Sequence, residues 1–216
     1  MNRRFTRDDV EILDDAEGYN GFFKLRRLRL RHRLFAGGWS KPISRELILR
    51  HAAVGVLLYD PQLDSVALLE QFRVGTLPGS DSPWLYELVA GLIDTDEPIE
   101  TVARREAQEE ASCSIRQLEK ITGYYSSPGG SSEYLHLYCG LTDLSQAGGI
   151  HGLATEGEDI RVQVVGFDEA WQWLLDGRIG NAHTLIAMQW LKLNRERLRH
   201  DAQSQGSSEE RSERHT

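Results

Sequence analysis

The sequence predicts an α/β protein of the α+β kind, with a mixed β-sheet sandwiched between helices and an N-terminal β-strand subdomain. Three observations support this class. Short runs with the alternation of half-buried strands fill most of residues 22–91. One acidic helical segment separates them from further strands, and two amphipathic helical segments follow near the C-terminus. This order differs from the regular alternation of a Rossmann fold, and no GxGxxG or P-loop motif occurs.

The elements follow from hydrophobic periodicity and turn-forming residues. Strands are expected at 22–35, 43–50, 52–60, 65–73, 84–91, 115–127, 134–144 and 160–167. Helices are expected at 98–111, 167–179 and 181–200. The first helix begins with Pro98, a favoured first-turn residue, after a cap at Asp96 or Glu97.

The chain is expected to have three parts. Residues 1–50 form an N-terminal β subdomain, within which 1–15 look like a loosely held arm. Residues 51–198 form the main domain. Residues 199–216 form a disordered tail, because they contain almost no apolar side chain.

Composition excludes several classes of function. A net charge of −8 argues against a nucleic-acid partner. No apolar run approaches the ~18 residues that a membrane span needs, and the polar N-terminus lacks the apolar core of a signal peptide. Two cysteines outside any metal-binding pattern fit a cytoplasmic location, which we therefore expect. Arginines alternate with leucines over 27–31, which predicts a charged face that protects an edge strand or attracts an anionic ligand.

The most informative segment is the acidic helix. At helical spacing Glu106 lies three and four residues before Glu109 and Glu110, so these carboxylates crowd one face. The last two also lie near the helix C-terminus, where the helix dipole disfavours negative charge. Such a cluster is stabilised by a hard divalent cation, which predicts a site for Mg²⁺ or Mn²⁺.

The same segment resembles the Nudix box, G-x5-E-x7-R-E-U-x-E-E-x-G-U, in which U is apolar. The matching positions are Gly91, Glu97, Arg105, Glu106, Glu109 and Glu110. Ser112 stands where the family has glycine, at a helix end that favours a left-handed residue. The departure bears on the loop geometry and leaves the acidic residues of the motif intact.

The resemblance extends over roughly residues 8–195, to the bacterial ADP-ribose pyrophosphatases of the Nudix superfamily. Pro128 follows Ser112 by 16 residues, a spacing typical of ADP-ribose hydrolases in that superfamily. The resemblance implies a Nudix fold and a homodimer that exchanges amino-terminal strands. It also implies Mg²⁺-dependent hydrolysis of ADP-ribose to AMP and ribose 5-phosphate, with Mn²⁺ as the alternative ion.

Roles for individual residues also come from the resemblance. Metal ligands are expected at the Ala90 carbonyl, Glu106, Glu109, Glu110 and Glu158. Glu156 is the expected catalytic base, although either glutamate of the 155–158 loop can serve. Gly91, Glu97 and Arg105 are expected to support the site, the last two by pairing with each other.

Substrate contacts are expected from residues far from the helix. Phe22 and Phe23 match positions that pack against adenine, and Arg73 suits the diphosphate because a guanidinium matches phosphate oxygens. The remaining positions are Arg45, Glu46, Arg50, Leu92, Ser127, Pro128, Gly129 and Glu133. Two alternatives stay open: hydrolysis of another nucleoside diphosphate sugar, and a non-catalytic module that senses ADP-ribose.

Overall fold

The computed structural model describes residues 4–79, 82–94, 96–153, 155 and 157–213, with side chains described up to residue 204. By its internal contacts the chain divides into two units. The arm unit comprises residues 1–52 and 125–134, and the core unit comprises 53–124 and 135–216. The loop at 125–134, which we expected in the main domain, thus groups with the N-terminal strands. The predicted division of the chain and the roles of its parts stay predictions.

The arm unit contains a three-stranded antiparallel sheet in the order β1-β2-β3. A short 3-10 helix, η1 (Arg7–Asp9), precedes β1 (Val10–Asn20), which is followed by β2 (Lys24–His32) and β3 (Ile43–Leu49). The prediction of a loose arm over 1–15 is wrong from Val10 onward, because β1 pairs with β2 along its length.

The arginine-rich strand β2 is the middle strand of this sheet, so the expectation of an edge strand is wrong. Two of its arginines pair with acidic residues of strand β1. Arg26 pairs with Asp15 at 2.8 Å, and Arg31 pairs with Glu11 at 2.5 Å. Cross-strand pairs of opposite charge stabilise the register of two exposed strands.

The core unit is built on a mixed sheet in the order β10-β11-β5-β4-β9-β8, with β6 on β5 and β7 on β4. Its strands are β4 (Ala52–Asp60), β5 (Ser65–Phe72), β6 (Trp84–Glu87), β7 (Val89–Ile93), β8 (Gln117–Tyr125), β9 (Tyr134–Leu141), β10 (Gly149–His151) and β11 (Ile160–Gly166). Its helices are α1 (Ile99–Ala111), α2 (Phe167–Leu175) and α3 (Ala182–Glu213), with a 3-10 turn η2 (Val74–Thr76) after β5.

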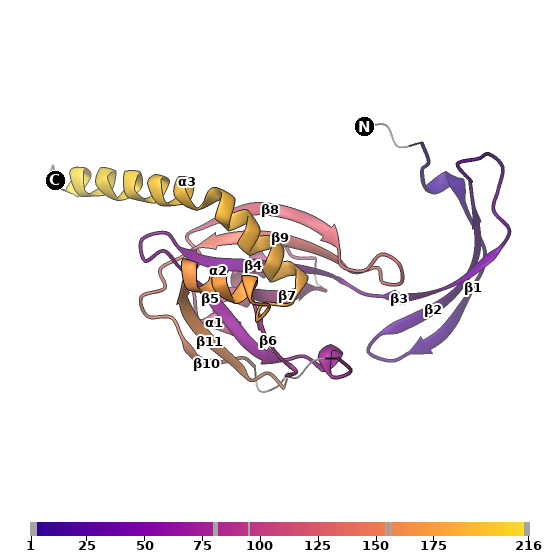
Figure 1. Cartoon of the computed structure of the whole chain (residues 1–216), viewed down its shortest axis with the longest axis horizontal. Helices are drawn as coiled ribbons and strands as arrows, with labels where there is room; N and C mark the ends of the chain where they lie inside the picture. The colour runs from indigo at the N-terminus through magenta and orange to yellow at the C-terminus, as the bar shows by residue number, and fades with distance from the viewer. Residues whose placement is uncertain (1–3, 80–81, 95, 154, 156, 214–216) are drawn as a thin grey trace. The chain divides into compact units, whose positions relative to one another are not determined.

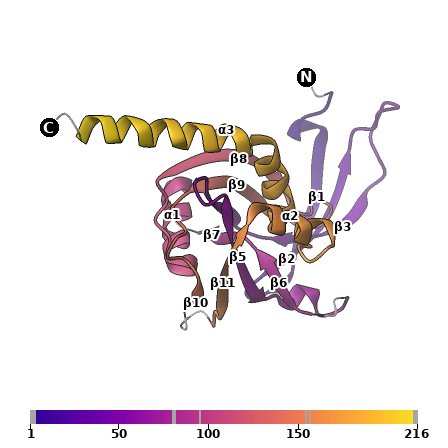
Figure 2. The ribbon, with the colours of Figure 1, turned by 60° about the vertical axis from the view of Figure 1, so that its left-hand side comes forward.

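Helices cover both faces of this sheet, as Figures 1 and 2 show. Alternate residues of β4 separate into two apolar clusters: Leu57 packs with residues of α2 and α3, whereas Val56 packs with residues of α1. Strand β4 is buried on both sides and pairs in parallel with β9, which accounts for its continuous apolar run. The expected mixed sheet between helices is confirmed.

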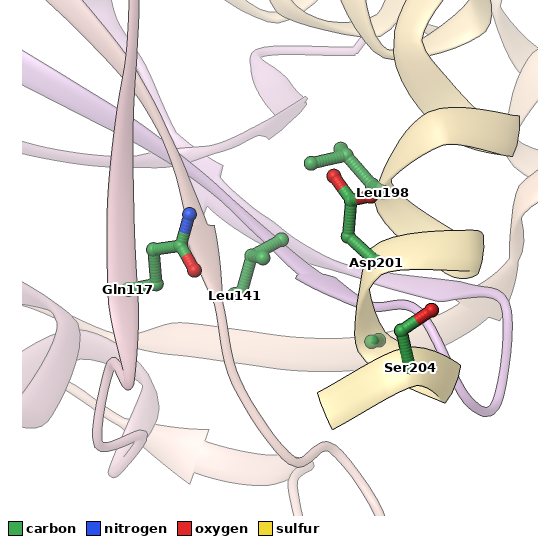
Figure 3. A pocket seen from close by; sticks show the side chains of 6 residues that line it. Gln117, Leu141, Leu198, Asp201 and Ser204 are labelled. Carbon is green, nitrogen blue, oxygen red and sulfur yellow. The ribbon is translucent and has the colours of Figure 1, made fainter. Parts of the chain in front are cut away.

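The C-terminal helix differs from expectation in its length. Helix α3 extends to Glu213, into the range for which the sequence predicts a disordered tail. Near this end a pocket lies between α3 and strands β8 and β9 (Figure 3), lined by Gln117, Leu141, Leu198, Asp201, Ala202 and Ser204. These lining residues include none of the predicted site residues. Within the described residues, no helix combines the length and apolar character that crossing a membrane requires.

Candidate active site

Helix α1 carries the acidic motif on a partly buried face. Pro98 occupies the N-cap position, where Asp96 or Glu97 was expected, and the C-cap residue after Ala111 is Ser112, whose left-handed conformation has φ 50°. Val102, Ala103 and Ala107 are buried against the sheet, and the helix places Glu110 on the same side. Apolar residues thus anchor the helix and carry a carboxylate into the interior.

Glu110 is the most buried acid of the motif, with only 3% of its surface exposed. Its Oε2 accepts a hydrogen bond from the backbone amide of Ala90 at 3.0 Å. Burial raises the pKa of Glu110 to about 8, and the negative charges of Glu106 and Glu158 act in the same direction, while the Ala90 hydrogen bond and Arg73 oppose the rise. The ionised form of Glu110 is therefore disfavoured, because the Ala90 hydrogen bond and the charge of Arg73 only partly offset the effect of burial.

Glu106 lies directly against Gly91. A Cβ at position 91 would collide with the Glu106 carboxyl group, which explains glycine at this point of β7. Burial raises the pKa of Glu106, opposed by Arg105 and supported by Glu109 and Glu158. Residues 90 and 91 of β7 are therefore the backbone against which Glu110 and Glu106 lie.

Arg105 neutralises part of the acidic cluster. Its Nη2 lies 2.9 Å from Glu106 Oε1, and its Nη1 donates to Glu109 Oε2 at 2.8 Å. Glu97 is exposed in the loop before α1, and its predicted pairing with Arg105 stays a prediction. The motif arginine thus bridges two of the motif glutamates.

The loop before β11 brings a further acid toward the helix. Glu158 Oε2 accepts a hydrogen bond from the backbone amide of Leu153 at 3.0 Å, and its charge acts on both Glu106 and Glu110. Gly152 has a φ of 101°, and a Cβ there would meet the Cβ of Glu158 at 2.7 Å. Glu156, the expected base, lies outside the described residues.

Ser112, after helix α1, and His151, on strand β10, make a contact that the sequence did not indicate. Ser112 Oγ lies 3.3 Å from His151 Nδ1, and His151 Nε2 lies 2.8 Å from the Gly148 carbonyl oxygen. The serine that replaces the motif glycine thus links the C-terminus of α1 to β10. No single sequence signal could have paired these residues.

Several substrate-site candidates meet in the arm unit. The guanidinium of Arg50 lies over the ring of Phe23 at 4.6 Å and pairs with Glu133 at 2.7 Å. Phe22 packs edge-on against Phe23 and is 85% exposed. The loop that carries Glu133 is tied to β3, since the Ile48 amide donates to the Gly130 carbonyl oxygen at 2.8 Å.

Six further substrate-site candidates are exposed. Arg45 and Glu46 lie on β3, opposite Leu28 and Arg27. Ser127, Pro128 and Gly129 form the exposed turn between β8 and β9. Leu92 lies on β7 in the core unit and is 37% exposed.

Arg73, which follows β5 in the core unit, has a buried partner that sequence reasoning missed. Its Nε donates to Glu87 Oε2 at 2.6 Å. Burial raises the pKa of Glu87, while Arg73 and Gln71 lower it. The sequence feature that could have indicated this partner is Glu87 itself, a single carboxylate inside the apolar run WLYELVAG.

The donor chemistry of α1 suits a divalent cation. Buried Glu110 and half-buried Glu106 face backbone at Ala90 and Gly91, and burial raises the pKa of both carboxyl groups, so a cation beside them would favour their ionised form. In the described part of the chain, no three acidic, histidine or cysteine side chains stand in a ready-made ligand cluster. Glu106 and Glu109 are instead turned to Arg105.

Comparisons with known proteins identify the family of this chain. A family model described as NUDIX domain matches residues 49–188. The ADP-ribose pyrophosphatase of Haemophilus influenzae is 47% identical over 195 residues, which cover 89% of this chain and 90% of that protein. The ADP-ribose pyrophosphatase of Escherichia coli (strain K12) is 45% identical over 197 residues, 91% of this chain and 94% of that protein.

Two further comparisons are more distant. The GDP-mannose pyrophosphatase of Cronobacter sakazakii is 39% identical over 151 residues, 69% of this chain and 78% of that protein. A solved crystal structure of an ADP compounds hydrolase superposes with a TM-score of 0.64 at 18% identity, covering 85% of this chain and 95% of that one. The last match bears on the fold alone.

Proposed function

Because the chain belongs to the NUDIX domain family, we propose that it hydrolyses the diphosphate of ADP-ribose to AMP and ribose 5-phosphate. The observation that carries the chemistry is the pair of carboxylates Glu110, which is buried against Ala90, and Glu106, which is half-buried against Gly91. The choice of substrate is supported by relatives named ADP-ribose pyrophosphatase, which match about nine-tenths of both chains.

Nudix hydrolases generally use a divalent metal, and we propose Mg²⁺, with Mn²⁺ as the alternative. The residues that would hold it are the Ala90 carbonyl and the carboxylates of Glu106, Glu109, Glu110 and Glu158. When bound, such an ion activates water and neutralises charge on the phosphates. Metal binding would require Glu106 and Glu109 to exchange their contacts with Arg105 for contacts with the ion.

The remaining roles belong to the protein's own side chains. A base must take the proton of the attacking water, and we assign this to the 155–158 loop, with Glu156 first and Glu158 second. Arg73 would bind diphosphate oxygens through its guanidinium. Gly91 and Arg105 would keep the acidic side chains in place, the first by leaving space and the second by charge.

Contacts in the arm unit support the proposed ribose and adenine contacts. Phe22 presents an exposed ring of the kind that stacks on a base, and Phe23 packs edge-on against it and under the Arg50 guanidinium. Glu133 is oriented by Arg50 and by Ser126, whose Oγ donates to it at 2.6 Å. We assign the other contacts to Arg45, Glu46, Leu92, Ser127, Pro128 and Gly129. A strand-exchanged homodimer and a cytoplasmic location stay predictions.

A substrate panel tests the proposal. Turnover of ADP-ribose, ADP-glucose, GDP-mannose, NADH and diadenosine polyphosphates is measured with Mg²⁺, with Mn²⁺ and with a chelator. We expect metal-dependent hydrolysis with ADP-ribose as the preferred substrate. A preference of more than about tenfold, ~1.4 kcal/mol in transition-state stabilisation, for another compound would overturn the substrate assignment.

Two other functions have different signatures in the same experiment. Relatives named GDP-mannose pyrophosphatase favour hydrolysis of another nucleoside diphosphate sugar as the second candidate. A sensor would bind ADP-ribose without turnover, but the motif glutamates are all present, which argues for chemistry. A Glu106→Gln variant should bind ADP-ribose and lose most turnover, and unchanged activity would refute its metal role.

A further inference from the structure

Strand β6 carries a buried carboxylate without an assigned role. Glu87 ends β6 opposite Leu69 of β5, and its side chain is only 4% exposed. A carboxylate buried this deeply is costly unless it is paired and hydrogen-bonded. The side chains that contact Glu87 therefore indicate its role.

Three side chains surround the Glu87 carboxylate. Arg73 Nε donates to Oε2 at 2.6 Å, and Gln71 Nε2 donates to the same oxygen at 3.2 Å. His183, at the start of α3, places Nε2 3.7 Å from Oε1, where that nitrogen is buried without a hydrogen-bond partner in the described structure. The carboxylate is thus held between two strands and a helix.

Arg73 is the exposed partner of this arrangement. Its side chain is 41% exposed, ten times the exposed fraction of Glu87. The described hydrogen bond engages Nε, which is one edge of the guanidinium and leaves the η nitrogens for another acceptor. The charge of Arg73 also lowers the pKa of Glu110, so it lies within electrostatic reach of the acidic helix.

We infer that Glu87 is a positioning residue that fixes the Arg73 guanidinium with its η nitrogens directed at the diphosphate of the substrate. This inference rests on the proposed function, in which Arg73 binds that diphosphate. A free arginine samples many rotamers, and binding must then order it at a cost. Glu87 orders the side chain before substrate arrives, and its burial keeps water from competing for Nε.

A double-mutant cycle tests the coupling of the two residues. The proteins are wild type, Glu87→Gln, Arg73→Ala and the double variant, assayed for ADP-ribose turnover and for binding of inorganic pyrophosphate by calorimetry. Glu87→Gln should lower kcat/KM by about tenfold, ~1.4 kcal/mol, mainly through KM, and should weaken pyrophosphate by a similar factor. In the Arg73→Ala background the same change should alter either quantity by less than about twofold.

Equal losses in both backgrounds would overturn the inference, because Glu87 would then act without Arg73. Glu119→Gln is the matched control: its carboxylate on β8 pairs with Arg197 of α3 at 2.5 Å, and its loss should leave both readouts unchanged. If Glu87→Gln fails to fold, Arg73→Lys keeps the charge but loses the fork of N–H groups. That variant should lose the same factor, and wild-type affinity would overturn the inference.

The outcomes separate this inference from the proposed function. Absence of ADP-ribose turnover in the wild type would refute the function, while the pyrophosphate cycle would still measure coupling between Glu87 and Arg73. Turnover with an additive cycle would leave the function standing and refute the positioning role.

Discussion

The buried carboxylate of Glu110 and the backbone amide of Ala90 are joined by a 3.0 Å hydrogen bond that ties α1 to β7. The strand therefore places a peptide group against a carboxyl group whose pKa is raised by burial to about 8. In Glu110→Gln the amide oxygen can still accept this bond, so the fold should persist while the charge is lost.

We expect Glu110→Gln to reduce metal-dependent turnover by more than about 100-fold, the upper range for losing a residue that merely supports a metal ligand. Steady-state kinetics across a Mg²⁺ titration measure this. Glu100→Gln, an exposed acid in the first turn of the same helix, is the control and should behave as wild type. Near-normal turnover of Glu110→Gln would exclude it from the metal site.

Gly91→Ala should disrupt the site by a steric clash alone. The new Cβ would meet the Glu106 carboxyl group and displace it, at a cost of ~1–3 kcal/mol in the free energy of unfolding. Turnover should fall by at least about tenfold, ~1.4 kcal/mol, because Glu106 leaves its position. Gly166→Ala is a suitable control, since a Cβ there meets nothing within 4 Å. Equal stability and activity of both variants would contradict the predicted collision.

Two substitutions at Ser112 should separate backbone strain from hydrogen bonding. Ser112→Gly relieves the left-handed conformation but loses the contact with His151, whereas Ser112→Ala keeps the strain and loses the contact. The glycine variant should therefore be more stable than the alanine variant by ~1 kcal/mol. Urea unfolding of the three proteins gives both differences. A more stable alanine variant would show that the left-handed residue carries no strain.

His183 should make stability depend on pH. Burial, aided by the charge of Arg73, lowers the pKa of His183 to about 4. In the unfolded chain the pKa is about 6.5, so the unfolded state binds the proton first as pH falls. The stability that this histidine contributes is thus present above about pH 6.5 and is lost toward pH 4, by ~2 kcal/mol between pH 7.5 and 5.

Thermal and urea unfolding of wild type and His183→Gln at pH 7.5 and 5 measure this effect. The difference in unfolding free energy between the two proteins should move in favour of the variant at pH 5. His200→Gln, whose side chain is 80% exposed, is the control and should show no comparable change. A difference independent of pH would contradict the depressed pKa.

Local patterns predicted most elements because their signals are contained within a few residues. The apolar run of β4 and the amphipathic segment of α2 both form where expected. Strands β1 and β10 were both missed, since each is defined by its pairing with another strand rather than by an apolar pattern of its own. The placement of β2 in the middle of its sheet has the same cause.

The sequence by itself determined the acidic motif and hence the chemistry, because the spacing of Glu106, Glu109 and Glu110 along one helix brings them together in any fold that keeps the helix. Only the tertiary structure decided which acid is buried and what faces it. Ala90 reaches Glu110 because β7 packs against α1, and Glu87 meets both Arg73 and His183 because two strands and a helix converge there. Desolvation and pairing depend on these long-range contacts, which no local spacing encodes.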